Sequence, residues 1–441
     1  MPVCLLCIKK KPSLLALINN QWICIKNVYD WNQKKNFLTC FIKGILKSCH
    51  RFKSGKLHSI KNMIICLISQ NASPGVTIFR KDFIGYLVNQ GHQVYAFAID
   101  YTEDSRSKVS KLGATPVDYL LNKSGFNVFK DLQDIWLLSR QLKKIQPDII
   151  LSSFVKPSIY GTLAARIAKV PRRIAMLEGL GYIYTPLKNN FSFKKKILQY
   201  VHGLLASIGY AFADKVLFLN QDDPVDLAKN SFINSKKFKV IGPIGLKLSD
   251  YPYSQVIITK TIRFIFIARM LVEKGVYEYL AAARVVKSKY PNAEFIMLGG
   301  LDPNNPTALS REQLNVVINE GVIIYPGEVL NVPEWLVKSH VFVLPSYREG
   351  FPRATQEAMS IGRAIITTDV PGCRETVQDG KNGFLIPLFD LETLVEKMIF
   401  LIKHPEEIVR MGNESHNIAL EKFDVNKINP VLEDIIVGSK S

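Results

Sequence analysis

Cysteine is scarce over most of this 441-residue sequence: only Cys66 and Cys373 occur after residue 49, and the other five cysteines fall within residues 1–49. Cys4 and Cys7 have the spacing of a zinc knuckle, but no second Cys or Cys/His pair follows at the expected distance. The number and spacing of the cysteines therefore exclude a disulfide framework and predict no structural zinc site.

Long apolar runs are also missing. No segment reaches the roughly 18 consecutive apolar residues that a membrane-spanning helix requires. The apolar patch at residues 13–18 is too short for a signal peptide, and no small-residue cleavage site follows it. No predicted strand is followed by Gly-x-Gly-x-x-Gly, which disfavours a redox enzyme that binds a dinucleotide.

Acidic residues are rare in the first 62 positions, which hold 12 Lys and Arg but a single Asp. The net charge is +11 in that segment, +11 over residues 63–250 and −3 over residues 251–441. This asymmetry predicts an anionic partner for the N-terminal side of the chain. Because no zinc-finger or RNP-type motif is present, we predict no nucleic-acid partner, which leaves anionic lipid headgroups or a phosphorylated acceptor.

Residues 1–62 differ from the rest of the chain in charge and in cysteine content. Met63 then opens an apolar run, residues 63–69, that is typical of the first buried strand of a doubly wound domain. We interpret residues 1–62 as a dispensable basic extension, either disordered or produced by an upstream misreading of the start.

From Met63 onward, short apolar runs alternate with segments of helical period, which is the pattern of parallel sheets with crossover helices. The predicted strands are residues 64–69, 93–99, 148–153, 172–177 and 215–219, followed by 261–267, 293–298, 322–325, 340–344, 364–367 and 383–386.

The expected fold is α/β, with two facing Rossmann-like domains and a ligand cleft at the carboxyl ends of their strands. The predicted boundaries are residues 63–245 for the N-terminal domain, 246–425 for the C-terminal domain, and 426–441 for a tail or helix that returns toward the first. A hinge is predicted around Gly242 and Gly245.

Two carboxylates, Glu349 and Glu357, lie eight residues apart across a predicted helix start that follows a buried-looking strand. A helix start offers free backbone N–H groups and a positive dipole end, where a diphosphate can bind. Pro352 suits the first helical turn because its missing N–H is not needed there. We expect Glu349 to face a sugar and Glu357 to accept hydrogen bonds from ribose hydroxyls.

Two further segments support a nucleotide-sugar site. Arg269 and Lys274 follow the predicted strand 261–267, where they are placed to neutralise a diphosphate. Gly299 ends the next predicted strand, and a glycine there permits close approach of a base or ribose.

Together these segments resemble the donor half of glycosyltransferase family 4, a retaining family of the GT-B fold, and the likeness covers essentially residues 63–436. The resemblance implies a hexosyltransferase of class EC 2.4, with a C-terminal nucleotide-sugar-binding domain and an N-terminal acceptor-binding domain. It implies front-face attack in which the leaving phosphate takes the acceptor proton. The residues assigned on this basis are Arg269, Lys274 and Glu349 as catalytic, and Gly299, Gly350, Phe351, Pro352 and Glu357 as donor-binding.

No cofactor and no metal are expected. No apolar strand is followed by Asp-x-Asp, the metal-holding sequence of the other large transferase architecture. Asp222 and Asp223 are better interpreted as a helix cap with a first-turn charge.

In the first domain, residues 175–182, taken with residues 346–352, resemble the bacterial branch that extends sugars on undecaprenyl diphosphate. This narrower likeness implies a UDP-linked donor and a polyprenyl-diphosphate-linked saccharide acceptor in O-antigen or capsule-like assembly. The predicted acceptor-binding residues are Gly75, Lys156, Glu178, Gly179 and Gly181. Arg80 and Arg173 are weaker candidates for contact with the acceptor diphosphate.

The sequence departs from the family at two places on the acceptor side. Residues 71–75 carry one glycine where many members carry a pair, and Glu178 lies where an acceptor-side histidine is expected. Which acceptor-side group assists the chemistry therefore stays open.

Residues 187–201 interleave aromatic residues with Lys194–Lys196 on a helical pattern. Such a segment can lie in the headgroup layer of an anionic membrane, and its alternative is a core-packed helix with a solvated lysine face. With the charge excess of the first domain, we expect a cytoplasmic protein that is peripheral at the cytoplasmic face of the inner membrane.

Two rival functions remain at this stage. A UDP-sugar 2-epimerase can share two facing wound domains and a nucleotide site, but it needs no acceptor. A non-catalytic partner that binds a nucleotide sugar is the other alternative, because fold alone does not decide function.

Overall fold

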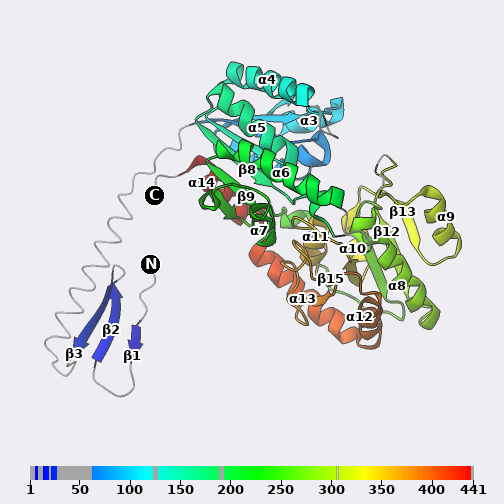
Figure 1. The fold of residues 1–441 in the computed structure, drawn as a ribbon. Coiled ribbons are helices and arrows are strands. Elements are labelled where there is room, and N and C mark those ends of the chain that lie inside the picture. The colour runs from blue at the N-terminus through cyan, green and yellow to red at the C-terminus, as the bar shows by residue number, and fades with distance from the viewer. Residues whose placement is uncertain are drawn as a thin grey trace. The chain divides into compact units, whose positions relative to one another are not determined.

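The computed structural model describes residues 5–7, 13–18, 21–26, 62–122, 128–186, 188, 193–303, 305 and 307–438 (Figure 1). The chain divides into two compact units, Met1–Lys61 and Asn62–Ser441. Of the first unit, the described residues form one antiparallel sheet of β1 (Leu5–Cys7), β2 (Ser13–Ile18) and β3 (Gln21–Lys26). The sequence predicted an apolar patch at residues 13–18, but no sheet.

The second unit begins with a seven-stranded parallel sheet in the order β10-β9-β8-β7-β4-β5-β6. Its strands are β4 (Ile64–Ile68), β5 (Gln93–Ala98), β6 (Thr115–Asp118), β7 (Ile149–Ser153), β8 (Arg172–Leu177), β9 (Lys215–Phe218) and β10 (Phe238–Val240). Its helices are α2 (Lys81–Asn89), α3 (Glu103–Lys111), α4 (Val128–Ile145), α5 (Val155–Ala168), α6 (Phe193–Ala211) and α7 (Asp222–Ala228), with short turns η1 (Ala72–Val76), η2 (Tyr182–Tyr184) and η3 (Ser235–Lys237).

Helices cover both faces of this sheet, which is why β7 is buried along its whole length and β4 and β8 over most of theirs. Cys66 and Ile68 of β4 pack with α4, α5 and α6 in one hydrophobic cluster, while Ile65 and Leu67 pack with α2, α3 and the C-terminal helix α14 (Val425–Val437) in another. We call this sheet and its helices the first lobe.

A second parallel sheet has six strands in the order β13-β12-β11-β14-β15-β16. Its strands are β11 (Arg263–Ile267), β12 (Glu294–Leu298), β13 (Ile324–Gly327), β14 (Val341–Leu344), β15 (Ala364–Thr368) and β16 (Gly383–Ile386). The helices around it are α8 (Val276–Lys289), α9 (Arg311–Asn319), α10 (Val332–Val337), α11 (Arg353–Ile361), α12 (Leu391–Lys403) and α13 (Pro405–Lys422), with η4 (Leu248–Asp250) and η5 (Val272–Lys274). We call this sheet and its helices the second lobe.

The predicted strands are confirmed to within one or two residues at their ends. Three elements at sheet edges differ from prediction. The strands β6 and β10 were not predicted, and β13 lies two residues later than expected. None of these edge strands is a fully buried run, and β6 contains Pro116, so the apolar signal that marks a central strand is missing.

The chain crosses between the lobes twice, and the two crossings lie side by side. The N–H of Leu246 donates to the carbonyl of Phe423 at 2.9 Å, and Leu246 forms a parallel bridge with Asp424. Beyond the second crossing, α14 packs on the first lobe, where Glu433 contacts Tyr86 at 2.7 Å and His92 at 2.9 Å. The C-terminal helix, red in Figure 1, therefore belongs spatially with the blue-to-green first lobe.

Candidate active site

The carboxyl ends of β11 and β14 bring two charged side chains together. Lys274 closes the turn η5, and Gly275 follows it in the left-handed region at φ 76°. A Cβ at Gly275 would lie 2.0 Å from the carbonyl oxygen of Pro345, so only glycine lets this turn approach the segment after β14. The result is that Lys274 faces Glu349.

Lys274 and Glu349 form an ion pair in which the lysine contacts both carboxylate oxygens. Lys274 Nζ lies 2.6 Å from Oε1 and 2.8 Å from Oε2 of Glu349, and Ser346 Oγ donates to Oε1 at 2.8 Å. The pair is mostly buried, with 21% of the lysine and 13% of the glutamate side chain exposed. Three charge-assisted hydrogen bonds from two donor groups fix the carboxylate.

The backbone of Glu349 is held by the loop after β15. Its N–H donates to the carbonyl of Pro371 at 3.0 Å. Gly372 lies at φ 79°, and a Cβ there would come within 2.4 Å of the Glu349 carbonyl oxygen. The segment after Thr367 thus supports the position of Glu349.

Arg269 follows the same strand as Lys274 but points elsewhere. Its guanidinium lies 3.2 Å from Asp302, and 61% of the side chain is exposed. The neighbouring residues Leu301 and Pro303 line an open cavity of about 750 Å³ that also includes Gly300 and Tyr325. Gly299 does not line it. At φ 137°, a Cβ on Gly299 would lie 1.9 Å from the Ala268 carbonyl oxygen, so this glycine permits the ends of β11 and β12 to touch.

Glu357 lies in α11, and its hydrogen-bond partners differ from those of the Lys274–Glu349 pair. Its Oε1 accepts hydrogen bonds from Tyr251 Oη at 2.8 Å and Arg353 Nε at 3.0 Å. Burial raises the pKa of Glu357 above its usual value, against the opposing effect of Arg353. Pro352 is the residue just before α11, one position earlier than the first-turn position predicted, and Phe351 packs edge-on against Phe423.

Gly179 and Gly350 join the acceptor side to the donor side. A Cβ at Gly350 would lie 1.9 Å from the carbonyl oxygen of Glu178, and one at Gly179 would lie 3.3 Å from the Gly350 nitrogen. The two lobes therefore touch backbone to backbone, one residue from Glu349. Side chains at either glycine would force them apart.

The other predicted acceptor residues have partners within the first lobe. Glu178 is ion-paired with the buried Arg80, and Lys156 contacts Asp131 at 2.9 Å. A Cβ at Gly75 would lie 2.5 Å from Ser69 Oγ, whereas Gly181, at φ 75°, faces open space.

Sequence reasoning missed the contacts made by the start of α7. Asp222 and Asp223 do lie in its first turn, and the N–H of Asp223 donates to Asn220 Oδ1 at 2.8 Å. The same carboxylates also bind arginines of the second lobe: Asp223 binds Arg348, and Asp222 lies 3.1 Å from Arg374. The N-cap of α7 is Gln221, and no side-chain cap hydrogen bond is made there, so the predicted cap at Asp222 and Asp223 is wrong and only the first-turn charge is confirmed. A first-turn charge gives no sequence signal for contacts with a distant arginine.

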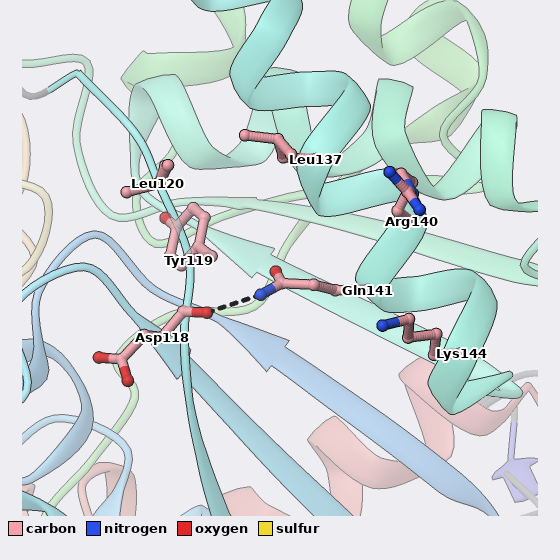
Figure 2. A pocket seen from close by; sticks show the side chains of 7 residues that line it. All are labelled: Asp118, Tyr119, Leu120, Leu137, Arg140, Gln141 and Lys144. Atoms are coloured by element: carbon pink, nitrogen blue, oxygen red, sulfur yellow. Dashed lines mark hydrogen bonds between the residues drawn. The ribbon is translucent and has the colours of Figure 1, made fainter.

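A separate cavity of about 370 Å³ lies between the end of β6 and α4 (Figure 2). Gln141 donates to the Asp118 carbonyl at 2.9 Å, and Arg140 and Lys144 lie along the helix beside it. It shares no residue with the predicted site. Within the parts of the chain that the structure describes, no group of three or more His, Cys, Asp or Glu side chains could hold a metal ion.

Two parallel α/β lobes that touch one residue away from the Lys274–Glu349 pair have the architecture of the GT-B fold, which two-domain glycosyltransferases share. Residues 261–404 match the family described as "Glycosyl transferases group 1", and residues 65–220 match the one described as "Glycosyl transferase 4-like". The chain belongs to glycosyltransferase family 4, and it is an enzyme of class EC 2.4. Membership of a transferase family decides against both the epimerase and the non-catalytic alternatives.

Curated relatives agree with this assignment. The chain is 30% identical over 370 residues to the N,N'-diacetylbacillosaminyl-diphospho-undecaprenol alpha-1,3-N-acetylgalactosaminyltransferase of Campylobacter jejuni, covering 81% of this chain and 94% of that protein. It is 24% identical over 328 residues to the UDP-Gal:alpha-D-GlcNAc-diphosphoundecaprenol alpha-1,3-galactosyltransferase of Escherichia coli, covering 71% and 82%.

A solved structure shares the fold. The crystal structure of Anabaena HepE in complex with UDP and glucose matches 86% of this chain and 100% of its own, with a TM-score of 0.68 and 18% identity.

Proposed function

We propose that this enzyme moves a hexose or N-acetylhexosamine from a UDP-linked donor to a polyprenyl-diphosphate-linked saccharide during assembly of a bacterial surface polysaccharide. The observation that carries the proposal is the Lys274–Glu349 pair at the junction of the two lobes. The acceptor class is supported by the undecaprenol-linked acceptors in the names of the Campylobacter and Escherichia relatives. UDP is supported by the latter name and by the HepE complex.

The donor is assigned to the second lobe. Its diphosphate binds Lys274, Arg269 and the N–H groups at the start of α11, near Gly350, Phe351 and Pro352. The uridine occupies the cavity bordered by Gly300, close to Gly299, and its ribose binds Glu357. No metal is required, because these groups already supply positive charge to the diphosphate.

The chemistry follows from where charge develops. The bond from the anomeric carbon to the phosphate oxygen breaks, and a bond from that carbon to the acceptor hydroxyl oxygen forms on the same face. The acceptor proton passes to the leaving phosphate. Lys274 and Arg269 stabilise the negative charge on that phosphate, and this is the main source of rate enhancement.

Glu349 orients the sugar hydroxyls. Both of its oxygens are hydrogen-bonded to Lys274, and one also to Ser346. A carboxylate so engaged is a weak nucleophile, which favours an orienting role over a covalent glycosyl intermediate.

The acceptor is assigned to the first lobe, at Gly75 and the turn Gly179–Gly181. Glu178 and Lys156 act there as part of the ion pairs with Arg80 and Asp131. Because Gly179 touches Gly350, an acceptor bound at this turn lies beside the donor site.

The membrane-facing element is α6. Along it, Phe193, Ile197, Tyr200, Leu204 and Ile208 recur every three or four residues, and each is between 45% and 73% exposed. On the opposite face of the helix, small residues such as Ala206 and Gly209 are buried. The exposed face of this helix is therefore apolar, which departs from the core-packed alternative with a lysine face.

Lysines border the apolar stripe. At 100° per residue, Lys194 and Lys196 lie on either side of it, while Lys195 turns toward the ring of Tyr182 at 4.7 Å. An apolar stripe between cations fits the headgroup layer of an anionic membrane. No helix among the described residues is long and apolar enough to span a bilayer.

The test is a panel of UDP-sugars offered with synthetic polyprenyl-diphosphate saccharides to the full-length chain, with products read by mass spectrometry. We expect one donor to add a single hexosyl or N-acetylhexosaminyl residue, at a rate that EDTA does not change. Equal transfer to the same saccharide without its lipid diphosphate would contradict the proposed acceptor. Loss of activity in EDTA would contradict the metal-free chemistry.

A further inference from the structure

We propose that Arg348 is a positioning residue that fixes Glu349 by anchoring its loop to carboxylates of the opposite lobe. The proposal rests on the role assigned to Glu349 above. It concerns a side chain of the second lobe whose partners, Asp223 and Asp226, belong to α7 of the first.

The contacts are short and buried. Arg348 Nη2 lies 2.5 Å from Asp223 Oδ1 and 2.9 Å from Asp226 Oδ2, and only 7% of the arginine side chain is exposed. Asp223 is completely buried. The Arg348 guanidinium also lies 6.0 Å from the centre of the Tyr184 ring, from the first lobe as well.

Burial makes this cluster sensitive to the loss of any member. Burial alone lowers the pKa of Arg348, but the two carboxylates outweigh it, so its pKa is raised and the guanidinium stays charged. Removing one partner would leave another buried charge uncompensated, and an unpaired buried charge is strongly destabilising. The cluster therefore joins the two lobes at this point in the structure.

A second anchor lies on the other side of Glu349. Asn220 Nδ2 donates to the Gly350 carbonyl at 2.9 Å and to Asp223 Oδ2 at 3.0 Å. Glu349 thus sits between two neighbours that are both bound to the start of α7. Its carboxylate, in turn, reaches Lys274.

In this arrangement α7 contributes to the reaction without contacting substrate, because it positions Glu349. The first lobe holds the acceptor, and through Arg348 and Gly350 it also sets the position of a donor-side carboxylate. A misplacement of about 1 Å at such a group can cost about 100-fold in rate. The two half-sites become correctly arranged only when the lobes are joined here.

The kinetic test uses two mild substitutions, Arg348→Lys and Asp226→Asn, and their combination. We expect each single change to lower kcat of transfer by about 10- to 100-fold and to leave the donor KM within about threefold, because the diphosphate and ribose groups are untouched. The double variant should lose little more than the worse single variant. Additive losses would mean that Arg348 contacts substrate, and unchanged kcat would mean that the cluster is only structural; either result overturns the proposal.

Arg374→Lys is the matched control. Arg374 also binds α7 across the lobes, through Asp222 at 3.1 Å, but its side chain is 39% exposed and, unlike Arg348, it is not next to Glu349 in the chain. We expect a kcat change of less than about threefold. A loss equal to that of Arg348→Lys would show that any contact between the lobes suffices, which also overturns the proposal.

A readout without substrate separates this inference from the proposed function. Hydrogen exchange of the segment 345–352 should speed up in Asp226→Asn and Arg348→Lys but not in Arg374→Lys, whichever acceptor the enzyme uses. Unchanged exchange in the first two variants sinks the positioning role even if transfer is observed. If no donor–acceptor pair gives transfer but hydrogen exchange does change in these variants, the proposed function is wrong and the positioning role stands.

Discussion

Glu349 receives hydrogen bonds from Lys274 and Ser346 through its carboxylate, and its neighbours on both sides are bound to the first lobe. A single side chain therefore depends on three separate segments of the chain for its position. Substitutions at this residue are the most direct way to examine the donor site.

Glu349→Gln should lower transfer substantially while leaving the shape of the side chain unchanged. The amide keeps one acceptor oxygen but loses the charge that pairs with Lys274. We expect a loss of about 2–4 kcal/mol in transition-state stabilisation, measured as kcat/KM with the preferred donor. Glu320→Gln, a surface residue paired with Arg284, is the control and should be near normal. Near-normal transfer by Glu349→Gln would refute the assignment.

His202 gives the protein a pH-dependent stability. It is buried beneath Tyr184, whose hydroxyl lies 3.0 Å from His202 Nδ1, and burial lowers the pKa of His202 from 6.5 to about 4. Between these values the unfolded chain binds a proton that the folded chain does not. The free energy of unfolding should therefore fall as pH falls through this window, by up to about 3 kcal/mol.

Urea unfolding of wild type and His202→Gln at pH 4.5 and 7 measures this contribution. We expect the variant to show a shallower loss of stability on acidification, because the titrating imidazole is gone. His404→Gln, which removes a half-exposed histidine, should keep the wild-type slope. Identical slopes in wild type and His202→Gln would contradict the prediction.

Site residues could be predicted from the sequence where a short motif next to a predicted strand marks them. Lys274 and Glu349 could be grouped from the sequence because each follows a buried strand of the same parallel sheet, and the structure joins them directly. Their chemical roles stay predictions. Arg348 and Asp223 are 125 residues apart in different lobes, and nothing in either local pattern indicates the other.

At the scale of elements, burial decides what the sequence reveals. Central strands such as β7 and β15 are buried throughout, so their apolar runs predict them well. The edge strand β6 is half-exposed and contains a proline, so it lacks such a run. The apolar stripe of α6 was only partly foreseen, since residues 187 and 189–192 of the predicted segment lie outside the described residues and the stripe continues to Ile208.

Replacing two stripe residues of α6 should weaken binding to anionic membranes. In the variant Ile197→Ser with Leu204→Ser, both changes remove exposed apolar side chains without touching the buried face. We expect vesicle flotation with anionic lipid to fall by about tenfold or more, since each side chain loses on the order of 1 kcal/mol of burial.

The control for this experiment is Val316→Ser, an equally exposed apolar residue on α9 in the second lobe, which should float like wild type. Wild-type binding should also weaken at high salt, because lysine contacts with headgroups are screened. Flotation that ignores both anionic lipid and the stripe substitutions would argue against α6 as the membrane-facing element.

At the scale of the molecule, the boundary between the two compact units falls at Lys61 and Asn62. A chain that begins at Met63 keeps both lobes, and we expect it to be soluble, folded and within about threefold of full-length transfer activity with a short-chain acceptor. Thermal unfolding and kcat measured side by side test this. An insoluble or inactive product would show that residues 1–62 are needed.

The two chain crossings are hydrogen-bonded to each other at Leu246 and Phe423, and this affects how the lobes can move. Because both connections between the lobes lie at this one place, we expect the lobes to open and close by rotating about it. Rotation about a single place brings the same surfaces of the two lobes together at every closure. We therefore expect each closure to re-form the contact between Arg348 and Asp223, and each opening of the lobes to release the product.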